Sequence, residues 1–256
     1  MLHNSVIKSV GRVFELLELF DEVRRPVSVM EVARALDMPQ SSTSALLRSM
    51  VTLGYCEADA TARRYLPTAR VTILGSWLET PLFEEGALIR LLNEIHAQTG
   101  ELVLLTSLSG LRVRHIYVLK AREANRPTKR AGTIRPLGRS GMGNLFLATF
   151  ADRRISRLVR QINAEEANAD YHIQPSALMA EIARIRERGY SVALDQMEIG
   201  VGGVNVLLPH MGKVEPMAVA ISTLSGIVAE RHEAFFAVIK NAVLRNLQQE
   251  LPRIGP

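Results

Sequence analysis

The sequence is poor in the residues that build several common kinds of functional site. Its one cysteine, Cys56, has no partner for a disulfide within the chain and cannot complete a multi-cysteine zinc or iron–sulfur site. The six histidines include no pair at the helical spacing of metal ligands, and the H-E-x-x-H motif is absent. We therefore expect no metal site and no bound cofactor.

Long apolar runs are also missing. The longest mild run, Met217–Val228, has 12 residues, whereas a helix that spans a membrane needs about 18. Glu15 and Glu18 interrupt the first apolar stretch, so a secretory signal peptide is not expected. Hydrophobic residues nevertheless form 47% of the 256 residues, enough to bury a sizeable core. These observations predict a globular, cytoplasmic protein without a membrane segment, built of one large or two modest domains.

The positive charge is concentrated in one part of the chain. The formal net charge is +5 and the isoelectric point is near 9.6, which favours a partner such as nucleic acid. Residues 1–80 hold nine basic and nine acidic side chains, while residues 111–139 hold nine basic and one acidic. The basic stretch and a DNA-binding motif therefore need not coincide.

The N-terminal pattern predicts two helices in succession. Ser28 and Glu31 have the spacing of a capping box, which opens a short helix through Leu36. Before it, apolar residues recur every three or four positions and line one face of a longer helix, at Val6, Val10, Val13, Leu17 and Phe20. A break at 37–39 then ends the second helix.

The next segment predicts a third helix and a hairpin. A hydroxyl-rich segment, 40–44, leads into an apolar run, and Gly54 closes the helix. Residues 55–67 have β-prone ends around a polar turn. A long helix, a short helix, a tight turn, a third helix and a hairpin, in this order, are typical of a winged helix-turn-helix. A small helical domain that binds protein is the alternative.

A winged helix-turn-helix makes specific demands on these residues. Its third helix enters the DNA major groove with the N-terminus first, so side chains on the opening turn reach phosphates or base edges. Basic side chains near the tip of the hairpin lie along the neighbouring phosphate backbone. The residues that we predict to contact DNA are Gln40, Ser41, Ser42, Thr43, Ser44, Arg48, Arg63 and Arg64.

The rest of the chain predicts an α+β, sensor-like domain. Residues 71–78 suggest a linking helix ended by Pro81, and apolar positions at helical spacing continue to Gly100. Strand patterns follow at 102–108, 113–119, 191–194, 204–208 and 216–223, with helices at 151–163, 176–188 and 229–250. Pairs such as Gly202-Gly203 are interpreted as turns. The predicted domains are 1–75 for DNA binding, 76–82 as a linker, and 83–256 for effector binding and oligomerisation.

Several segments resemble the IclR family of bacterial transcriptional regulators: Ser9–Phe20, Val32–Pro39, Leu46–Tyr55, Tyr65–Gly75, Thr99–Leu104 and Gly189–Val201. The similarity spans nearly the whole chain. It implies a winged helix-turn-helix joined to a GAF-like effector-binding domain. It also implies a homodimer or a dimer of dimers on palindromic double-stranded operator DNA, with a small organic effector.

The chain departs from the family pattern at several positions. The family usually carries basic residues where this chain has Gln40 and Ala45, so the third helix neutralises few phosphates and salt dependence should be modest. The family's Gly-Lys-Ala appears here as Gly143-Asn144-Leu145, and its late cysteine is replaced around Val204-Asn205. The identity of the effector therefore cannot be borrowed from better-known members.

Candidate effector-binding residues come from two glycine-rich segments and one strand end. The first segment, 138–143, leads into an apolar helix whose N-terminus could receive an anion, although an ordinary capped turn is the alternative. Polar groups at the other two places could orient a ligand held by apolar walls, or serve only as turn and cap residues. The predicted residues are Ser140, Gly141, Met142, Asp195, Glu198, Asn205, Ser222 and Thr223.

The basic stretch, 111–139, allows three interpretations. It is a solvated face that pairs with acidic neighbours, a positive field around the effector pocket suited to an anionic ligand, or an auxiliary DNA contact. Its position in the middle of the second domain favours the pocket over DNA.

We expect a sequence-specific DNA-binding transcriptional regulator whose operator affinity is modulated by a small organic effector. One alternative is a DNA-binding regulator whose second domain serves only for assembly. The other is a small-molecule enzyme that uses the winged domain for dimerisation, but no catalytic residues are identified. Met142 breaks the G-x-S-x-G motif, Asn144 breaks the phosphate loop, and the S-x-x-K match at 5–8 has no partner motifs.

Overall fold

The chain folds into two compact units, residues 1–79 and 80–256, which we call the head and the body. The computed structural model describes residues 7–59, 61, 63–74, 86–210 and 215–256. The predicted linker at 76–82 and the end of the predicted linking helix lie outside the described residues. No helix of the described part is long and apolar enough to cross a membrane.

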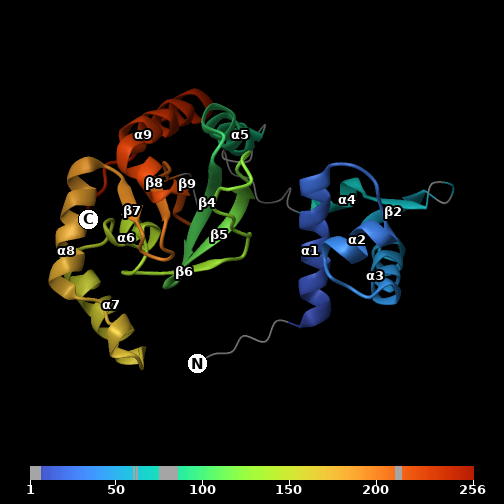
Figure 1. Ribbon diagram of the computed structural model, residues 1–256, viewed down its shortest axis with the longest axis horizontal. Coiled ribbons are helices and arrows are strands. Elements are labelled where there is room, and N and C mark those ends of the chain that lie inside the picture. Colours follow the sequence, from blue (N-terminus) through green and yellow to red (C-terminus); the bar gives the residue numbers. More distant parts are fainter. Residues whose placement is uncertain (1–6, 60, 62, 75–85, 211–214) are drawn as a thin grey trace. The chain divides into compact units, whose positions relative to one another are not determined.

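The head contains a helical bundle and a small sheet (Figure 1). Its antiparallel sheet has the strand order β1-β3-β2, so the predicted hairpin gains a short third strand. The elements are α1 (Lys8–Val23), β1 (Val27–Ser28), α2 (Val29–Ala35), α3 (Gln40–Thr52), β2 (Cys56–Asp59), β3 (Arg64–Pro67) and α4 (Ala69–Ile73). The predicted order of helices and hairpin is the observed one.

Local sequence signals explain where the helices of the head begin and end. The predicted capping box is present, because the Ser28 hydroxyl accepts from the Glu31 N–H at 3.3 Å and the Glu31 carboxylate accepts from the Ser28 N–H at 2.8 Å. Gly54, at φ +78°, follows α3 in the left-handed conformation, and its N–H donates to the Val51 carbonyl.

A small apolar core holds the head together. It is formed by Leu16, Phe20, Val27, Val32, Leu47, Met50 and Cys56. Cys56 behaves as the small buried apolar residue that the sequence predicts, and burial raises the pKa of its thiol to about 11. The thiolate is therefore scarce at neutral pH.

The body is built around one six-stranded antiparallel sheet with the order β6-β5-β4-β9-β8-β7 (Figure 1). The elements are α5 (Ala87–Thr99), β4 (Leu102–Ser109), β5 (Arg112–Leu119), β6 (Ile134–Pro136), α6 (Gly141–Leu147), α7 (Asp152–Glu165), a 3₁₀ turn (Ala169–Tyr171), α8 (Pro175–Arg188), β7 (Ser191–Leu194), β8 (Val201–Leu207), β9 (Met217–Leu224) and α9 (Ser225–Leu247). All predicted strands and helices of this part are present, whereas β6 was not predicted.

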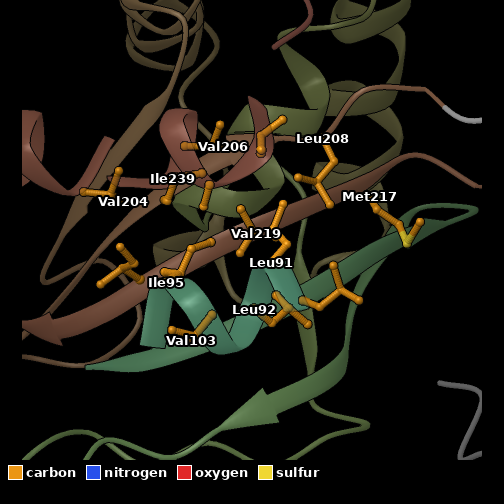
Figure 2. Close-up of a cluster of buried hydrophobic side chains, with 14 of the residues drawn as sticks. Leu91, Leu92, Ile95, Val103, Val204, Val206, Leu208, Met217, Val219 and Ile239 are labelled. Atoms are coloured by element: carbon orange, nitrogen blue, oxygen red, sulfur yellow. The ribbon is translucent and has the colours of Figure 1, made fainter. Parts of the chain in front are cut away.

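Helices cover both faces of the sheet. Along β4, Val103 and Leu105 face α5 and α9, while Leu102 and Leu104 belong to the core beneath α6, α7 and α8. Figure 2 shows part of the first core, in which helix and sheet side chains meet: Leu91, Leu92, Ile95, Val204, Val206, Val219 and Ile239. The antiparallel sheet is thus buried on both sides, which explains its nearly continuous apolar strands.

Two glycines that we interpreted as a turn lie inside a strand instead. Gly202 and Gly203 belong to β8, where they pair with Thr223 and Ser222 of β9. A Cβ at Gly202 would come within 2.9 Å of the Val228 side chain, so the missing side chain lets α9 approach the strand closely. The turn that joins β7 to β8 is the loop 195–200, which we call the roof loop.

Candidate functional site

The start of α3 forms an exposed polar surface on the head. Gln40, Ser41 and Ser42 are exposed, and no hydrogen bond to any described residue engages the hydroxyls of the two serines. Arg48 lies on the same helix, is exposed, and donates to the Ser44 hydroxyl at 3.2 Å. These side chains can exchange water for phosphate oxygens or base edges without breaking the fold.

Thr43 differs from the prediction. It is fully buried, and its hydroxyl donates to the Pro39 carbonyl at 3.1 Å. The reason is helical phase, because Thr43 shares the inward face of α3 with Leu47 and Met50. Thr43 therefore holds the start of the helix and is not available to DNA.

The two arginines of the hairpin have different surroundings. Arg63 is exposed, at φ +49°, and makes no ion pair with the described part of the chain. Arg64 instead donates to the Pro26 carbonyl at 3.0 Å and to the Glu31 carboxylate at 3.3 Å. Hydrogen bonds from the Ser28 backbone and from Arg25 lower the pKa of Glu31 to about 2. Arg64 thus ties the hairpin to α2, while Arg63 is free to meet a phosphate backbone.

A small pocket of about 80 Å³ lies on the α6 side of the body sheet, beneath the roof loop. Its walls come from β4, β5, β6, β8, β9, the start of α6 and the roof loop. Six of the eight predicted effector residues line it: Ser140, Gly141, Met142, Glu198, Asn205 and Ser222. Segments far apart in the sequence therefore converge on one cavity.

Several pocket groups also hold the structure together. The Ser140 hydroxyl caps α6, accepting from the Gly143 N–H at 3.1 Å and donating to the Pro136 carbonyl at 2.7 Å. Gly141 allows α6 to approach the sheet, because a Cβ there would be 2.5 Å from that of Ala193. The buried Asn205 amide, in contrast, makes no hydrogen bond with the described residues.

Asp195 and Thr223 do not line the pocket. The Asp195 carboxylate accepts from the Ser225 hydroxyl at 2.7 Å and from the Gly200 N–H at 2.6 Å, which fixes the two ends of the roof loop. These hydrogen bonds, the one from Ser225 first, lower the pKa of Asp195. Thr223 follows Ser222 on β9, and successive strand residues point to opposite faces, so Thr223 faces away from the pocket.

The pocket also contains residues that the sequence did not single out. His115 of β5 is buried, and neither ring nitrogen has a hydrogen-bond partner. Lys129 and Arg135 belong to the basic stretch and line the same pocket. Burial first, and then the charges of Arg135 and Lys129, lower the pKa of His115 to about 4. In the sequence, Val113 between Arg112 and Arg114 places His115 on the inward face of β5, but nothing there marks it as a ligand contact.

The basic stretch divides between the pocket and ordinary ion pairs. Lys129 donates to the roof-loop carboxylate of Glu198 at 2.5 Å, which lowers the pKa of Glu198. Elsewhere, Arg126 pairs with the buried Glu101 at 3.1 Å and Arg139 pairs with Glu166 at 3.2 Å. The stretch therefore supplies two cations to the lining of the pocket and pairs others with acidic neighbours. Among the described residues, no group of three or more His, Cys, Asp or Glu side chains is placed to hold a metal ion.

Comparison with known proteins assigns both units. A family model described as the C-terminal part of bacterial transcriptional regulator IclR matches residues 86–245, and a model of the IclR helix-turn-helix domain matches residues 9–60. The HTH-type transcriptional regulator XynR of Escherichia coli (strain K12) is 22% identical over 250 residues, which cover 98% of this chain and 95% of XynR. The HTH-type transcriptional regulator BhcR of Paracoccus denitrificans is 27% identical over 93% of this chain and 84% of BhcR.

Solved structures share the fold. IclR of Thermotoga maritima superposes with a TM-score of 0.58 at 22% identity, over 95% of this chain and 100% of that one. An IclR transcriptional regulator from Alicyclobacillus acidocaldarius gives a TM-score of 0.57 at 20% identity, over 94% of this chain and 97% of that one. The curated relatives XynR and BhcR are HTH-type transcriptional regulators, and the helix-turn-helix model matches the head, so the comparisons favour a regulator over the enzyme alternative. Since the two family models together match most of the chain, the protein belongs to the IclR family of bacterial transcriptional regulators.

Proposed function

We propose that this regulator binds a palindromic operator through the exposed start of α3 and through Arg63, and that a small organic anion in the body pocket modulates this binding. The observation that carries the proposal is the convergence of Lys129 and Arg135 on one pocket beneath the roof loop. Two cations and one carboxylate, Glu198, leave the pocket with a net positive charge. A cleft of one charge sign attracts ligands of the opposite sign.

The size of the pocket limits the ligand. A water molecule takes about 30 Å³ of liquid volume, and an apolar cavity of about 150 Å³ can hold benzene. A pocket of about 80 Å³ therefore suits a molecule with few carbon atoms. Small organic acids meet both the size and the charge that the pocket requires.

The DNA side of the proposal rests on the exposed hydroxyls of Ser41 and Ser42, and on the cations of Arg48 and Arg63. Few cations in this set mean few neutralised phosphates, so the salt dependence of operator binding should be modest. A regulator that binds bacterial DNA would act in the cytoplasm, which is the location that we propose.

An exposed apolar row on α1 supports the proposed homodimer. Val10 and Phe14 of α1 and Ile7, its N-cap residue, lie at the spacing of one helix face and are 46%, 59% and 70% exposed. A second copy of the chain, packed on the same row about a two-fold axis, would cover it and present two copies of α3. Two such helices match half-sites about 34–36 Å apart, or a multiple of that distance.

A mobility-shift titration with the DNA upstream of the protein's own gene tests operator binding. Ser42→Ala should weaken specific binding about fivefold while leaving binding to unrelated DNA nearly unchanged, because a hydroxyl that contacts a base edge contributes only to the specific complex. Ser49→Ala is the matched control, since Ser49 lies on the last turns of α3 and bonds within the helix to the Ala45 carbonyl. Equal losses on both DNAs would show that this turn does not recognise sequence.

A thermal-shift screen of organic acids, aromatic compounds and neutral metabolites tests the sensor. A ligand at one hundred times its dissociation constant stabilises the fold that binds it by about 2.7 kcal/mol. Each compound that stabilises the protein should also change the mobility shift. If no compound does either, the body serves only for assembly.

A further inference from the structure

Three buried or half-buried polar side chains of the effector pocket, those of His115, Arg135 and Asn205, make no hydrogen bond with the described residues, and the first two lie side by side. His115 is 2% exposed, yet Nδ1 and Nε2 both lack a hydrogen bond. Arg135 of β6 is half-buried and makes no hydrogen bond or ion pair with the described residues. A buried polar group is stable only when something meets its hydrogen-bonding capacity, so the unpaired ring of His115, inside a pocket and beside a half-buried cation, is a candidate contact for a ligand.

The two cations of the pocket are not equivalent. The Lys129 ammonium already contacts the Glu198 carboxylate at 2.5 Å and is 15% exposed. Glu198 comes from the roof loop and Lys129 from the connection between β5 and β6, so their ion pair joins two edges of the pocket. Arg135 feels the charge of Glu198 but makes no hydrogen bond or ion pair with the described residues, so its planar fork of N–H donors is open to a carboxylate.

His115 is an uncharged hydrogen-bonding group at neutral pH. Burial and the two neighbouring cations lower its pKa to about 4, so the ring carries one N–H donor and one acceptor nitrogen. Thr106 of β4, the residue opposite His115 on the neighbouring strand, donates its hydroxyl hydrogen to the Ala218 carbonyl at 3.1 Å and makes no hydrogen bond to the ring. The ring therefore needs a neutral polar atom from the ligand.

Sheet geometry places His115 and Arg135 side by side. Arg135 pairs with Val113, and His115 lies two residues further along β5 on the same face. Such diagonal neighbours are about 7–8 Å apart at their Cα atoms, within reach of long side chains. Asn205 is on β8, three strand spacings or about 14 Å from β5, so it is not a neighbour of His115 and Arg135.

We propose that the pocket selects a small monocarboxylate with a hydroxyl on the neighbouring carbon, that Arg135 binds the carboxylate, and that His115 recognises the hydroxyl. A hydroxyl both donates and accepts, so it satisfies either tautomer of the ring. One unused positive charge matches a monoanion, while a second carboxylate would meet Glu198. This inference rests on the proposed effector function.

Titration calorimetry on the full chain tests the ligand class with three matched probes: 2-hydroxybutanoate, butanoate and 2-hydroxybutanamide. We expect 2-hydroxybutanoate to bind most tightly. Butanoate should bind about tenfold more weakly, because it leaves His115 unpaired. The amide should lose binding, because it lacks the charge that Arg135 requires.

Four variants assign the roles. His115→Leu should abolish the preference for 2-hydroxybutanoate over butanoate, whereas His115→Gln, which keeps a donor and an acceptor, should retain part of it. Arg135→Met should weaken both acids more than Lys129→Met does. The melting temperature of each unliganded variant shows whether it folds, and the ratio of the two affinities remains interpretable even when both affinities fall.

The outcomes separate this inference from the proposed function. If butanoate and 2-hydroxybutanoate bind equally well, and His115→Leu does not change this, the proposed role of His115 is wrong. The proposal that the body binds an effector would not be affected. A larger loss with Lys129→Met than with Arg135→Met would also overturn the inference alone, whereas binding only by compounds outside the acid class would overturn the anionic effector of the proposed function as well. If no compound of any class binds the protein or alters the mobility shift, both this inference and the proposed effector function are wrong.

Discussion

The head and the body hold their polar groups in opposite ways. On the head, the hydroxyls of Ser41 and Ser42 are exposed to water and unpaired. In the body, the unpaired groups of His115 and Asn205 are buried beneath the roof loop. A long, rigid, charged partner such as DNA can be met on an open surface, whereas a small molecule must be enclosed before a few contacts can hold it.

The two units also differ in how much apolar core supports them. Seven buried residues form the core of the head, while each of the two clusters in the body contains twenty. The head thus has little reserve stability, which makes it the more sensitive of the two to a single truncation.

Leu47→Ala should have the largest effect and should act on the head alone. Leu47 is fully buried in the head core, and its truncation costs about 2–5 kcal/mol. Operator binding should be lost, while amide hydrogen exchange of body peptides stays unchanged. Leu53, the exposed C-cap residue of α3, provides the control. Leu53→Ala should change stability by less than about 0.5 kcal/mol. Loss of protection throughout the body would show that the two units do not unfold separately.

Gly143→Ala makes the corresponding test of the body. A Cβ at Gly143 would lie 2.4 Å from the Pro136 carbonyl oxygen and 2.9 Å from the Leu137 Cα, and backbone atoms cannot move aside easily. The expected cost is about 3 kcal/mol, measured as a lower urea midpoint of the body. Gly226→Ala is the matched control, because nothing lies within 4 Å of its added Cβ, and it should be neutral or slightly stabilising. A normal midpoint for Gly143→Ala would mean that α6 can move away from the sheet.

Acid should destabilise the two units over different pH ranges. The pKa of His115 falls from 6.5 to about 4 on folding, so the unfolded chain binds a proton first, and the body loses stability as the pH falls from 6.5 towards 4. For one titrating group, the free energy of unfolding changes by at most about 1.4 kcal/mol per pH unit. The pKa of Glu31 falls from 4.5 to about 2 on folding. The contribution of Glu31 to the stability of the head is therefore lost as the pH falls below 4.5. Urea midpoints of wild type and His115→Gln, measured from pH 7 to pH 4, should converge as the pH falls.

Ser28→Ala removes half of the capping box and should destabilise the head by about 1 kcal/mol. The body should not respond, and operator affinity should change only where the head is partly unfolded. Urea unfolding at pH 7, with Ser49→Ala as the control, measures the difference. A loss no larger than that of the control would show that the Glu31 carboxylate alone holds the start of α2.

The smallest effect is expected at the hairpin. Arg63→Ala should leave stability unchanged and lower the slope of operator binding against salt concentration by about one, the signature of a lost phosphate contact. Arg64→Ala should do the reverse, because its guanidinium bonds to Pro26 and Glu31. Salt titrations of the mobility shift distinguish them, and equal slopes for both variants would contradict the division of roles.

Local signals in the sequence were sufficient for most elements but not for the directions of side chains. Ser28 and Glu31 predicted the start of α2 correctly, because a capping box is a contact between near neighbours. β6 was missed because its three residues, ending in Pro136, are too few to show a period. Its pairing with β5 depends on a contact distant in sequence.

The site could be predicted only as a set of segments. Thr43 was predicted to contact DNA and Thr223 to bind the effector, but their positions along α3 and β9 turn both side chains away. The spacing of Thr43 to Leu47, and of Thr223 to Ser222, already contained this information. His115 gave no such signal as a lone histidine. Its importance depends on the neighbours that folding places around it, which are Lys129 and Arg135.

The Asp195 carboxylate gives the roof loop a mechanical property. It bonds to Gly200 at one end of the loop and to Ser225, the first residue of α9. The loop therefore cannot lift as a hinged flap, since its base is fixed to the start of a helix of 23 residues, about 34 Å long. A molecule that pushes the loop outward therefore pulls directly on the first residue of α9, so that occupancy of the pocket acts on a helix that covers the opposite face of the sheet.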